Sequence, residues 1–396
     1  MKLRLLVYLL PACLLFLLPG EPTSPTTILA LVGDVMLGRG VAQALDGDWE
    51  AAFAGVQPWL SDADLAFANL ESPLTTSPPL PPFPPSLPSS PSLPSLPSLP
   101  SPPSPPSPPS LPSSPSLPSP PSPPSLPAPP SPSSYDLRAP LEAVASLHAA
   151  GFDVVSLVNN HALDAGQAGL RETVDTLHAA GIATLANWET GTLVDGSPIY
   201  QSTSLPTYHS TNLPTYQPTN LPIYRLLAFD DSLTPLDVEA TASTVANAAA
   251  QADLVIVSIH WGGEYQAAPS SRQRTIASQL ARAGAGLIVG HGPHVLQRIE
   301  WVGETLVAYS LGNFLFDQPY PADCRWGAIL RVTLRDDRIV AVEALPTVVE
   351  RGHVIPASPE TAAHIRTRLA SGIRDQEPGI SIQPPIPDPR SLIPNP

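Results

Sequence analysis

The sequence contains few cysteines and few positive charges. Two of its 396 residues are cysteine, and Cys13 lies within an apolar N-terminal segment, so a processed chain keeps Cys324 alone. A single cysteine cannot form an internal disulfide, so packing has to stabilise the fold of the processed chain. Lysine and arginine total 19 against 34 aspartates and glutamates, for a net charge of −15. Nucleic acid is therefore excluded as a partner, because binding its phosphates requires basic patches.

Two long stretches lack the residue types that build a core. Residues 77–134 are almost entirely Pro, Ser and Leu with a three-residue repeat, and they hold most of the 55 prolines. That composition predicts extended, solvated polyproline II structure. Residues 197–224 contain eight-residue repeats such as STNLPTYQ. Strand and helix patterns resume after each stretch, so both are interpreted as disordered low-complexity insertions within one domain.

The insertions divide a domain predicted to span residues 27–346. About 270 residues of ordinary composition remain, enough for one large domain. Removing the second insertion joins residues 198–200 to residues 225–227 and predicts a single strand that ends near Phe229. Residues 347–396 are expected to form a short helix followed by a disordered, proline-rich tail.

The first 20 residues predict export. Two cations precede about 15 apolar residues, the pattern of a signal peptide and short for a membrane span. No clear cleavage site follows, so an uncleaved anchor that associates the protein with the membrane remains open. Either alternative predicts an extracytoplasmic protein, secreted or membrane-anchored.

The hydrophobic pattern predicts an α/β domain. Apolar strand runs alternate with amphipathic helices, and after residue 289 the pattern becomes strand followed by strand, which suggests a two-sheet sandwich flanked by helices. Strands are expected at residues 27–32, 64–68, 153–158, 182–185, 254–259, 287–289, 296–301, 305–309, 328–334 and 339–345. Helices are expected at residues 49–60, 139–150, 167–180, 238–251, 271–283 and 359–369.

Six short strings rich in metal-binding residue types lie where these strands end. In order they are LVGDVMLGR, FANLESPLT, LVNNHALDAG, VSIHWGGEY, IVGHGPHV and AYSLGNF. Ligands of open α/β sheets bind beyond the carboxyl ends of the strands. Asp, Glu, Asn and His gathered there predict a divalent metal site. A lone His or Asp at a strand end is more often structural, so the prediction depends on the six strings together.

The individual candidates differ in strength. Asp34 and Glu71 place carboxylates after two strands, although either residue alone could serve a turn or a loop. Asn160 and His161 follow an apolar run and would leave many polar groups to satisfy without a ligand. Asp164 lies three residues after His161, within reach of its ring. The remaining candidates are histidines in the fourth and fifth strings: His260, His291 and His294.

Together the strings resemble the poly-γ-glutamate capsule biosynthesis (CapA-type) family, a branch of the calcineurin-like metallophosphatase superfamily. The resemblance implies a metallophosphatase-like two-sheet β-sandwich flanked by helices. It also implies that Asp34 and His294 hold one metal, that Asn160, His260 and His291 hold another, and that Glu71 bridges the two. His161 would be the general acid, supported by Asp164, and Arg39 and Asn313 would bind substrate anions or shape the pocket.

This chain departs from the superfamily pattern at two positions. The Asp-x-His expected after the first strand is Asp34-Val35-Met36, and the bridging carboxylate is Glu71 in place of an aspartate. The first metal position therefore lacks a strong nitrogen ligand. We predict one tightly bound metal and one that is weak or absent, with Mn, Fe, Zn and Mg all open.

Three functions remain open. The first is a hydrolase that cleaves a phosphoester, or an amide such as a γ-glutamyl linkage, in a small-molecule or polymeric anionic substrate. The second is a non-catalytic, metal-containing component of the capsule-synthesis machinery that binds or exports an anionic polymer. The third, a wall-associated stalk built on the Pro/Ser tract, leaves the six strings unexplained. The family resemblance does not decide among these three functions, because fold does not imply function.

Overall fold

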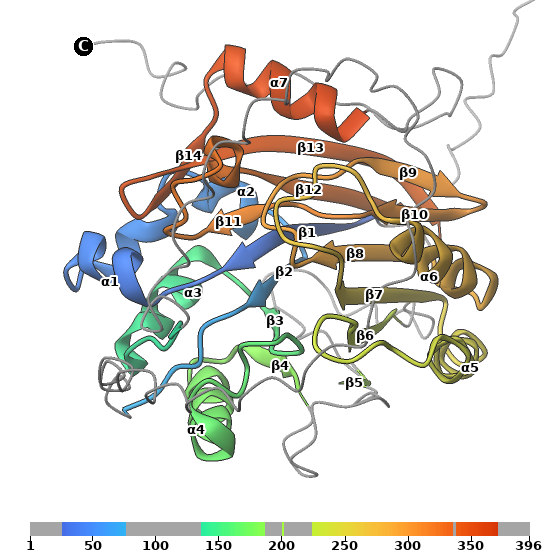
Figure 1. Ribbon diagram of the computed structural model, residues 1–396, viewed down its shortest axis with the longest axis horizontal. Helices are drawn as coiled ribbons and strands as arrows, with labels where there is room; N and C mark the ends of the chain where they lie inside the picture. The colour runs from blue at the N-terminus through green and yellow to red at the C-terminus, as the bar shows by residue number, and fades with distance from the viewer. Residues whose placement is uncertain (1–25, 77–135, 187–199, 202–223, 336–337, 371–396) are drawn as a thin grey trace, which may run out of the picture.

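The computed structural model describes residues 26–76, 136–186, 200–201, 224–335 and 338–370 (Figure 1). The predicted signal peptide, the Pro/Ser insertion and the predicted tail beyond residue 370 lie outside these residues. Within them, no helix combines the length and the apolar character that a membrane crossing requires.

The larger sheet contains eight strands. Four of them are parallel and run from the centre to one edge: β1 (Thr26–Val35), β2 (Leu65–Leu70), β3 (Val154–Ser156) and β4 (Ala183–Leu185). On the other side of β1 lie three antiparallel strands, β12 (Trp326–Arg335), β13 (Arg338–Glu350) and β14 (His353–Pro356). The short β11 (Asn313–Leu315) pairs in parallel with the end of β1.

The smaller sheet contains six strands in the order β5-β6-β7-β8-β10-β9. Its parallel centre is formed by β6 (Tyr224–Asp230), β7 (Leu254–His260) and β8 (Leu287–His291), with β10 (Thr305–Ala308) parallel to β8. The antiparallel edges are β5 (Tyr200–Gln201) and β9 (Ile299–Val302).

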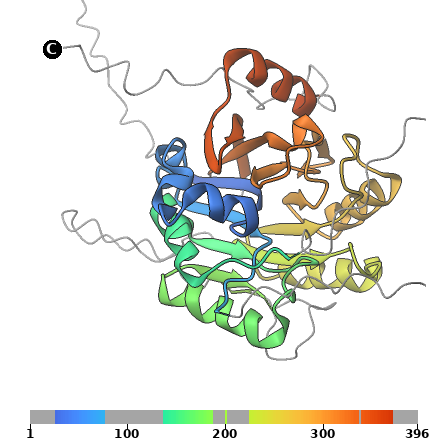
Figure 2. The same ribbon diagram turned by 60° about the vertical axis from the view of Figure 1, so that its left-hand side comes forward.

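The two sheets pack face to face, and helices cover their outer faces (Figures 1 and 2). Alternation along β1 shows the layering: Leu29 and Leu31 join the core between the sheets, while Ala30 and Val32 join the core beneath the helices. Helices α1 (Arg39–Leu45), α2 (Gln57–Ser61), α3 (Val144–Ala150) and α4 (Gly166–Ala179) cover the larger sheet. Helices α5 (Val238–Ala249) and α6 (Ser271–Arg282) cover the smaller sheet, and α7 (Pro359–Ala370) packs on β9, β12 and β13.

The predicted α/β two-sheet sandwich flanked by helices is confirmed, with local corrections. The single helix expected at residues 49–60 is wrong: a 3₁₀ turn at Trp49–Phe53 is separated from α2. Gly55 lies between them, and a side chain there would come within 2.9 Å of the Val354 carbonyl of β14. The single strand expected across the second insertion is also wrong, because Tyr200–Gln201 pairs antiparallel with β6 instead of extending it.

Strand registers bring the polar strand ends together at one edge of the sandwich. In the larger sheet Asp34 is aligned with Asn69 and with Asn313. In the smaller sheet His260 is aligned with both Asp230 and His291. Gly33 makes this approach possible: a Cβ there would lie 1.9 Å from the Gly312 carbonyl oxygen, which accepts a hydrogen bond from the Asp34 N–H at 3.0 Å.

Candidate metal centre

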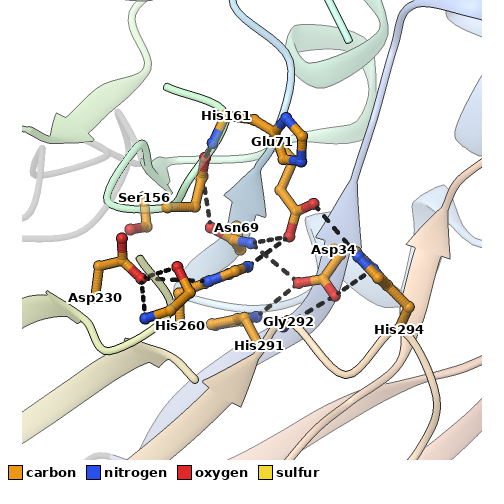
Figure 3. Close-up of polar contacts among 12 residues, drawn as sticks. Asp34, Asn69, Glu71, Ser156, His161, Asp230, His260, His291, Gly292 and His294 are labelled. Carbon is orange, nitrogen blue, oxygen red and sulfur yellow. Dashed lines mark hydrogen bonds and ion pairs between the residues drawn. The ribbon is translucent and has the colours of Figure 1, made fainter. Parts of the chain in front are cut away.

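Two buried carboxylates form the centre of the site. Asp34 near the end of β1 and Glu71 directly after β2 both have no solvent exposure. The Asn69 amide nitrogen lies between them and donates to Asp34 Oδ1 at 3.0 Å and to Glu71 Oε1 at 2.9 Å (Figure 3). Two buried carboxylates without a cation are costly, so the amide donors only partly compensate their charge.

Three histidines surround these carboxylates from the smaller sheet (Figure 3). The Nε2 atom of His260 lies 3.2 Å from Glu71 Oε1. His291 Nδ1 lies 3.4 Å from Asp34 Oδ1. His294 reaches both acids, with Nδ1 3.3 Å from Asp34 Oδ2 and Nε2 4.0 Å from Glu71 Oε2. All three histidines are buried, and each has a ring nitrogen within 3.4 Å of a carboxylate oxygen of Asp34 or Glu71.

The buried acids and histidines of this cluster shift one another's pKa values. Burial lowers the pKa of His260, but hydrogen bonds with Asp230 and Glu71 outweigh that effect and raise the pKa to about 10. Burial also lowers the pKa of His294, but the charge of Glu71 and the contact with Asp34 raise it to about 9. Burial raises the pKa of Asp34, yet the histidine contacts hold it well below its ordinary value. In the absence of metal, His260 and His294 therefore carry positive charge beside the acids.

Several polar atoms at the site have no hydrogen-bond partner. They include Glu71 Oε2, Asn160 Oδ1 and His291 Nε2, all buried. Buried polar atoms are normally satisfied, so a cluster of unsatisfied ones indicates a missing ligand. Carboxylate and imidazole donors fit a borderline divalent cation such as Zn²⁺, Mn²⁺ or Fe²⁺. Ligand atoms of Asp34, Glu71 and His294 lie within 4.8 Å of one another, so this buried group can hold a metal ion.

The grouping of Asp34, Glu71 and His294 differs from the expected distribution of ligands between the two metal positions. The sequence predicted that the half built on Asp34 and His294 is depleted, because Met36 replaces a histidine. The structure brings these two residues together with Glu71. Met36 itself is fully buried in the core beneath the helices, where its sulfur accepts a hydrogen bond from the Gly38 N–H at 3.1 Å. His294 supplies the nitrogen atom that this half offers to a metal.

The predicted general acid lies at the side of the carboxylates. His161 Nδ1 is 3.0 Å from Asp164 Oδ2, and the His161 ring is 16% exposed. Its backbone N–H donates to the fully buried Asn159, whose amide in turn donates to Asn69 Oδ1 at 3.0 Å. His161 is thus connected to the carboxylate pair through two asparagine side chains. Asn160 is half-buried, with only its unsatisfied Oδ1 pointing to a ligand role.

The two residues predicted to contact substrate occupy different environments. Arg39 is partly exposed, pairs with Asp317, and places its guanidinium 5.6 Å from the Phe316 ring centre. Asn313 is fully buried. Its Oδ1 faces His294 Nδ1 at 2.9 Å, and its Nδ2 donates to Gln318 Oε1 and to the Cys324 carbonyl, both at 3.0 Å. Asn313 was expected to bind substrate anions or to shape the pocket, and its burial beside His294 fits the second alternative.

Three residues of the site were not predicted. Asn69 was present in the string FANLE, but only the strand register shows that its amide lies between two acids. Asn159 was seen beside Asn160 and was not chosen. Asp230 ends β6, and its Oδ1 lies 3.4 Å from His260 Nδ1. Burial raises the pKa of Asp230, but the His260 contact lowers it below its ordinary value. Asp230 directly follows the strand end expected near Phe229, but it was not chosen as a candidate.

Comparison with known proteins identifies the family. The model of the bacterial capsule synthesis protein family PGA_cap matches residues 28–95, 123–190 and 199–318, so the chain belongs to this family. It is 31% identical over 224 residues to the capsule biosynthesis protein CapA of Bacillus anthracis, covering 56% of this chain and 54% of that protein. It is 30% identical over 225 residues to the PGA biosynthesis protein CapA of Bacillus subtilis (strain 168), covering 57% and 58%.

The chain thus matches little more than half the length of these two relatives. Among solved structures, a novel phosphatase from Mycoplasma pneumoniae is similar at 10% identity with a TM-score of 0.43, covering 82% of this chain and 94% of that one. A likeness of this extent assigns no activity. The CapA-type resemblance of the six strings is confirmed by the family match and the two relatives.

Proposed function

We propose that this protein is an extracytoplasmic, metal-dependent hydrolase of capsule-polymer metabolism that cleaves a phosphoester or a related bond. The observation that supports it most is the buried Asp34–Glu71–His294 group, with unsatisfied acid and imidazole atoms beside it. When bound, a divalent metal lowers the pKa of water and neutralises developing charge on a substrate oxygen.

Each residue of the site would then have a separate role in the reaction. Asp34, Glu71 and His294 would hold the tightly bound ion, and His260, His291 and Asn160 would supply the donors for a weaker second ion. Asn69 keeps the two carboxylates apart and oriented. His161, in contact with Asp164, donates a proton to the leaving oxygen. Arg39, at the partly exposed edge near Phe316, would contact an anionic group of the substrate.

The hydrolase proposal is tested with a generic aryl phosphodiester and added Mn²⁺. General acid catalysis contributes on the order of 10²–10⁴-fold, so His161→Ala should lower kcat by about that factor while leaving metal binding intact. His364→Ala is the matched control, because His364 is exposed on α7. Equal rates for wild type and His161→Ala would reject the catalytic role and favour a metal-containing component that binds or exports an anionic polymer.

A further inference from the structure

The backbone fixes the positions of Asn313 and His294 relative to each other. Asn313 begins β11, whose register with β1 aligns it with Asp34. His294 follows Pro293 and adopts a left-handed backbone conformation with φ of 58°. Such a conformation in a non-glycine residue persists only where its surroundings impose it. Both side chains are buried, so neither can exchange its partner for water.

The hydrogen bonds around Asn313 assign the orientation of its amide. Its Nδ2 faces the main-chain carbonyl of Cys324, an atom that can only accept a hydrogen bond. The nitrogen is therefore correctly placed on that side, and the oxygen is the atom that faces His294 Nδ1 at 2.9 Å. Gln318 Oε1, 3.0 Å from the same Nδ2, is consistent with this orientation.

The amide orientation in turn fixes the His294 ring. Nδ1 faces two oxygen acceptors, Asn313 Oδ1 and Asp34 Oδ2, the latter at 3.3 Å. An unprotonated nitrogen would place its lone pair against both oxygens, so Nδ1 must carry the hydrogen. In the neutral ring the lone pair then lies on Nε2, the nitrogen that faces Glu71 Oε2.

We infer that Asn313 is a positioning residue that selects the Nδ1–H form of His294 and thereby presents Nε2 to the metal. It acts through His294 and does not touch substrate. This role develops the second of the two alternatives expected for Asn313, that it shapes the pocket. The inference rests on the proposed metal site, because the value of the selected tautomer is that it offers a ligand atom beside Glu71.

Nitrogen chemical shifts test the inference without an activity assay. In the uniformly ¹⁵N-labelled protein loaded with Zn²⁺, we expect His294 to bind metal through Nε2 and to show a protonated Nδ1. Coordination through Nδ1 would overturn the inference. If the wild type binds no Zn²⁺, the metal proposal fails on its own. The tautomer is then measured in the metal-free protein at about pH 10.5, where the Nδ1–H form supports the inference and the Nε2–H form overturns it.

Metal affinities of Asn313 variants provide a second test of the inference. Removing an outer hydrogen-bond partner of a metal-binding histidine costs about 10- to 100-fold in affinity. We expect Asn313→Leu to weaken Mn²⁺ binding by that factor in calorimetry, whereas Asp175→Asn, at an exposed position of α4, should match wild type. Unchanged affinity in Asn313→Leu would overturn the inference. If that variant does not fold, the wild-type tautomer measurement decides alone.

Discussion

Glu71 and His260 meet at one edge of the sandwich, although 189 positions separate them in the chain: Glu71 Oε1 lies 3.2 Å from His260 Nε2. One residue follows β2 of the larger sheet and the other ends β7 of the smaller sheet. The site therefore depends on how the two sheets pack, and both sheets contribute ligand atoms to it.

Asp230 should orient the ring of His260, whose other nitrogen contacts Glu71. Its Oδ1 lies 3.4 Å from His260 Nδ1, so the carboxylate can orient the ring and favour a donor Nδ1. We expect Asp230→Asn to weaken binding of the second, weaker metal by about 10- to 100-fold in a Mn²⁺ titration. Asp175→Asn, at an exposed position of α4, is the control and should match wild type. Equal affinities for Asp230→Asn and wild type would show that Asp230 does not support the site.

Stability should depend on pH in opposite ways with and without metal. The raised pKa values of His260, about 10, and His294, about 9, mean that the folded metal-free protein holds protons that the unfolded chain releases near pH 6.5. Their stabilisation is fully present below that pH and is lost as pH rises through about 9 and 10. Metal replaces these protons and binds more tightly as pH rises.

Calorimetric melting between pH 7 and pH 10 checks this difference. The chelated protein should lose melting temperature over this interval, and the increase caused by saturating Mn²⁺ should grow over the same interval. Parallel curves with and without metal would contradict the assignment of the raised histidine pKa values to the metal site.

Residues 77–134 should be dispensable for folding. The segments that flank them are joined directly: the Thr75 N–H donates to the Ala139 carbonyl at 3.0 Å, and the Ala139 N–H donates to the Pro73 carbonyl at 2.9 Å. Replacing 77–134 with a short Gly/Ser linker should therefore preserve metal binding and change stability by no more than about 2 kcal/mol, since loop-closure cost varies slowly with length. A collapse of the melting temperature would show that part of this stretch belongs to the folded domain.

The sequence predicted the fold from strong local patterns and the site from polar residues at strand ends. Asp34, Glu71, His260, His291 and His294 were all chosen on that basis, and all lie in one cluster. Asn69 and Asp230 were not chosen, because their importance follows from the lateral register between strands, which no local pattern encodes. The contact of Asn313 with His294 could not be predicted for a similar reason: β11 has only three residues, and its pairing with β1 is not encoded locally.

Metal analysis of protein purified without chelator tests the central claim most directly. After dialysis the wild type should retain one equivalent of a transition metal, since Asp34, Glu71 and His294 form one compact buried group. Asp34→Asn should retain almost none, because it removes a charged ligand, while Asp175→Asn should retain one equivalent. Two equivalents in the wild type would contradict the one-tight-metal account, and none would contradict the metal centre itself.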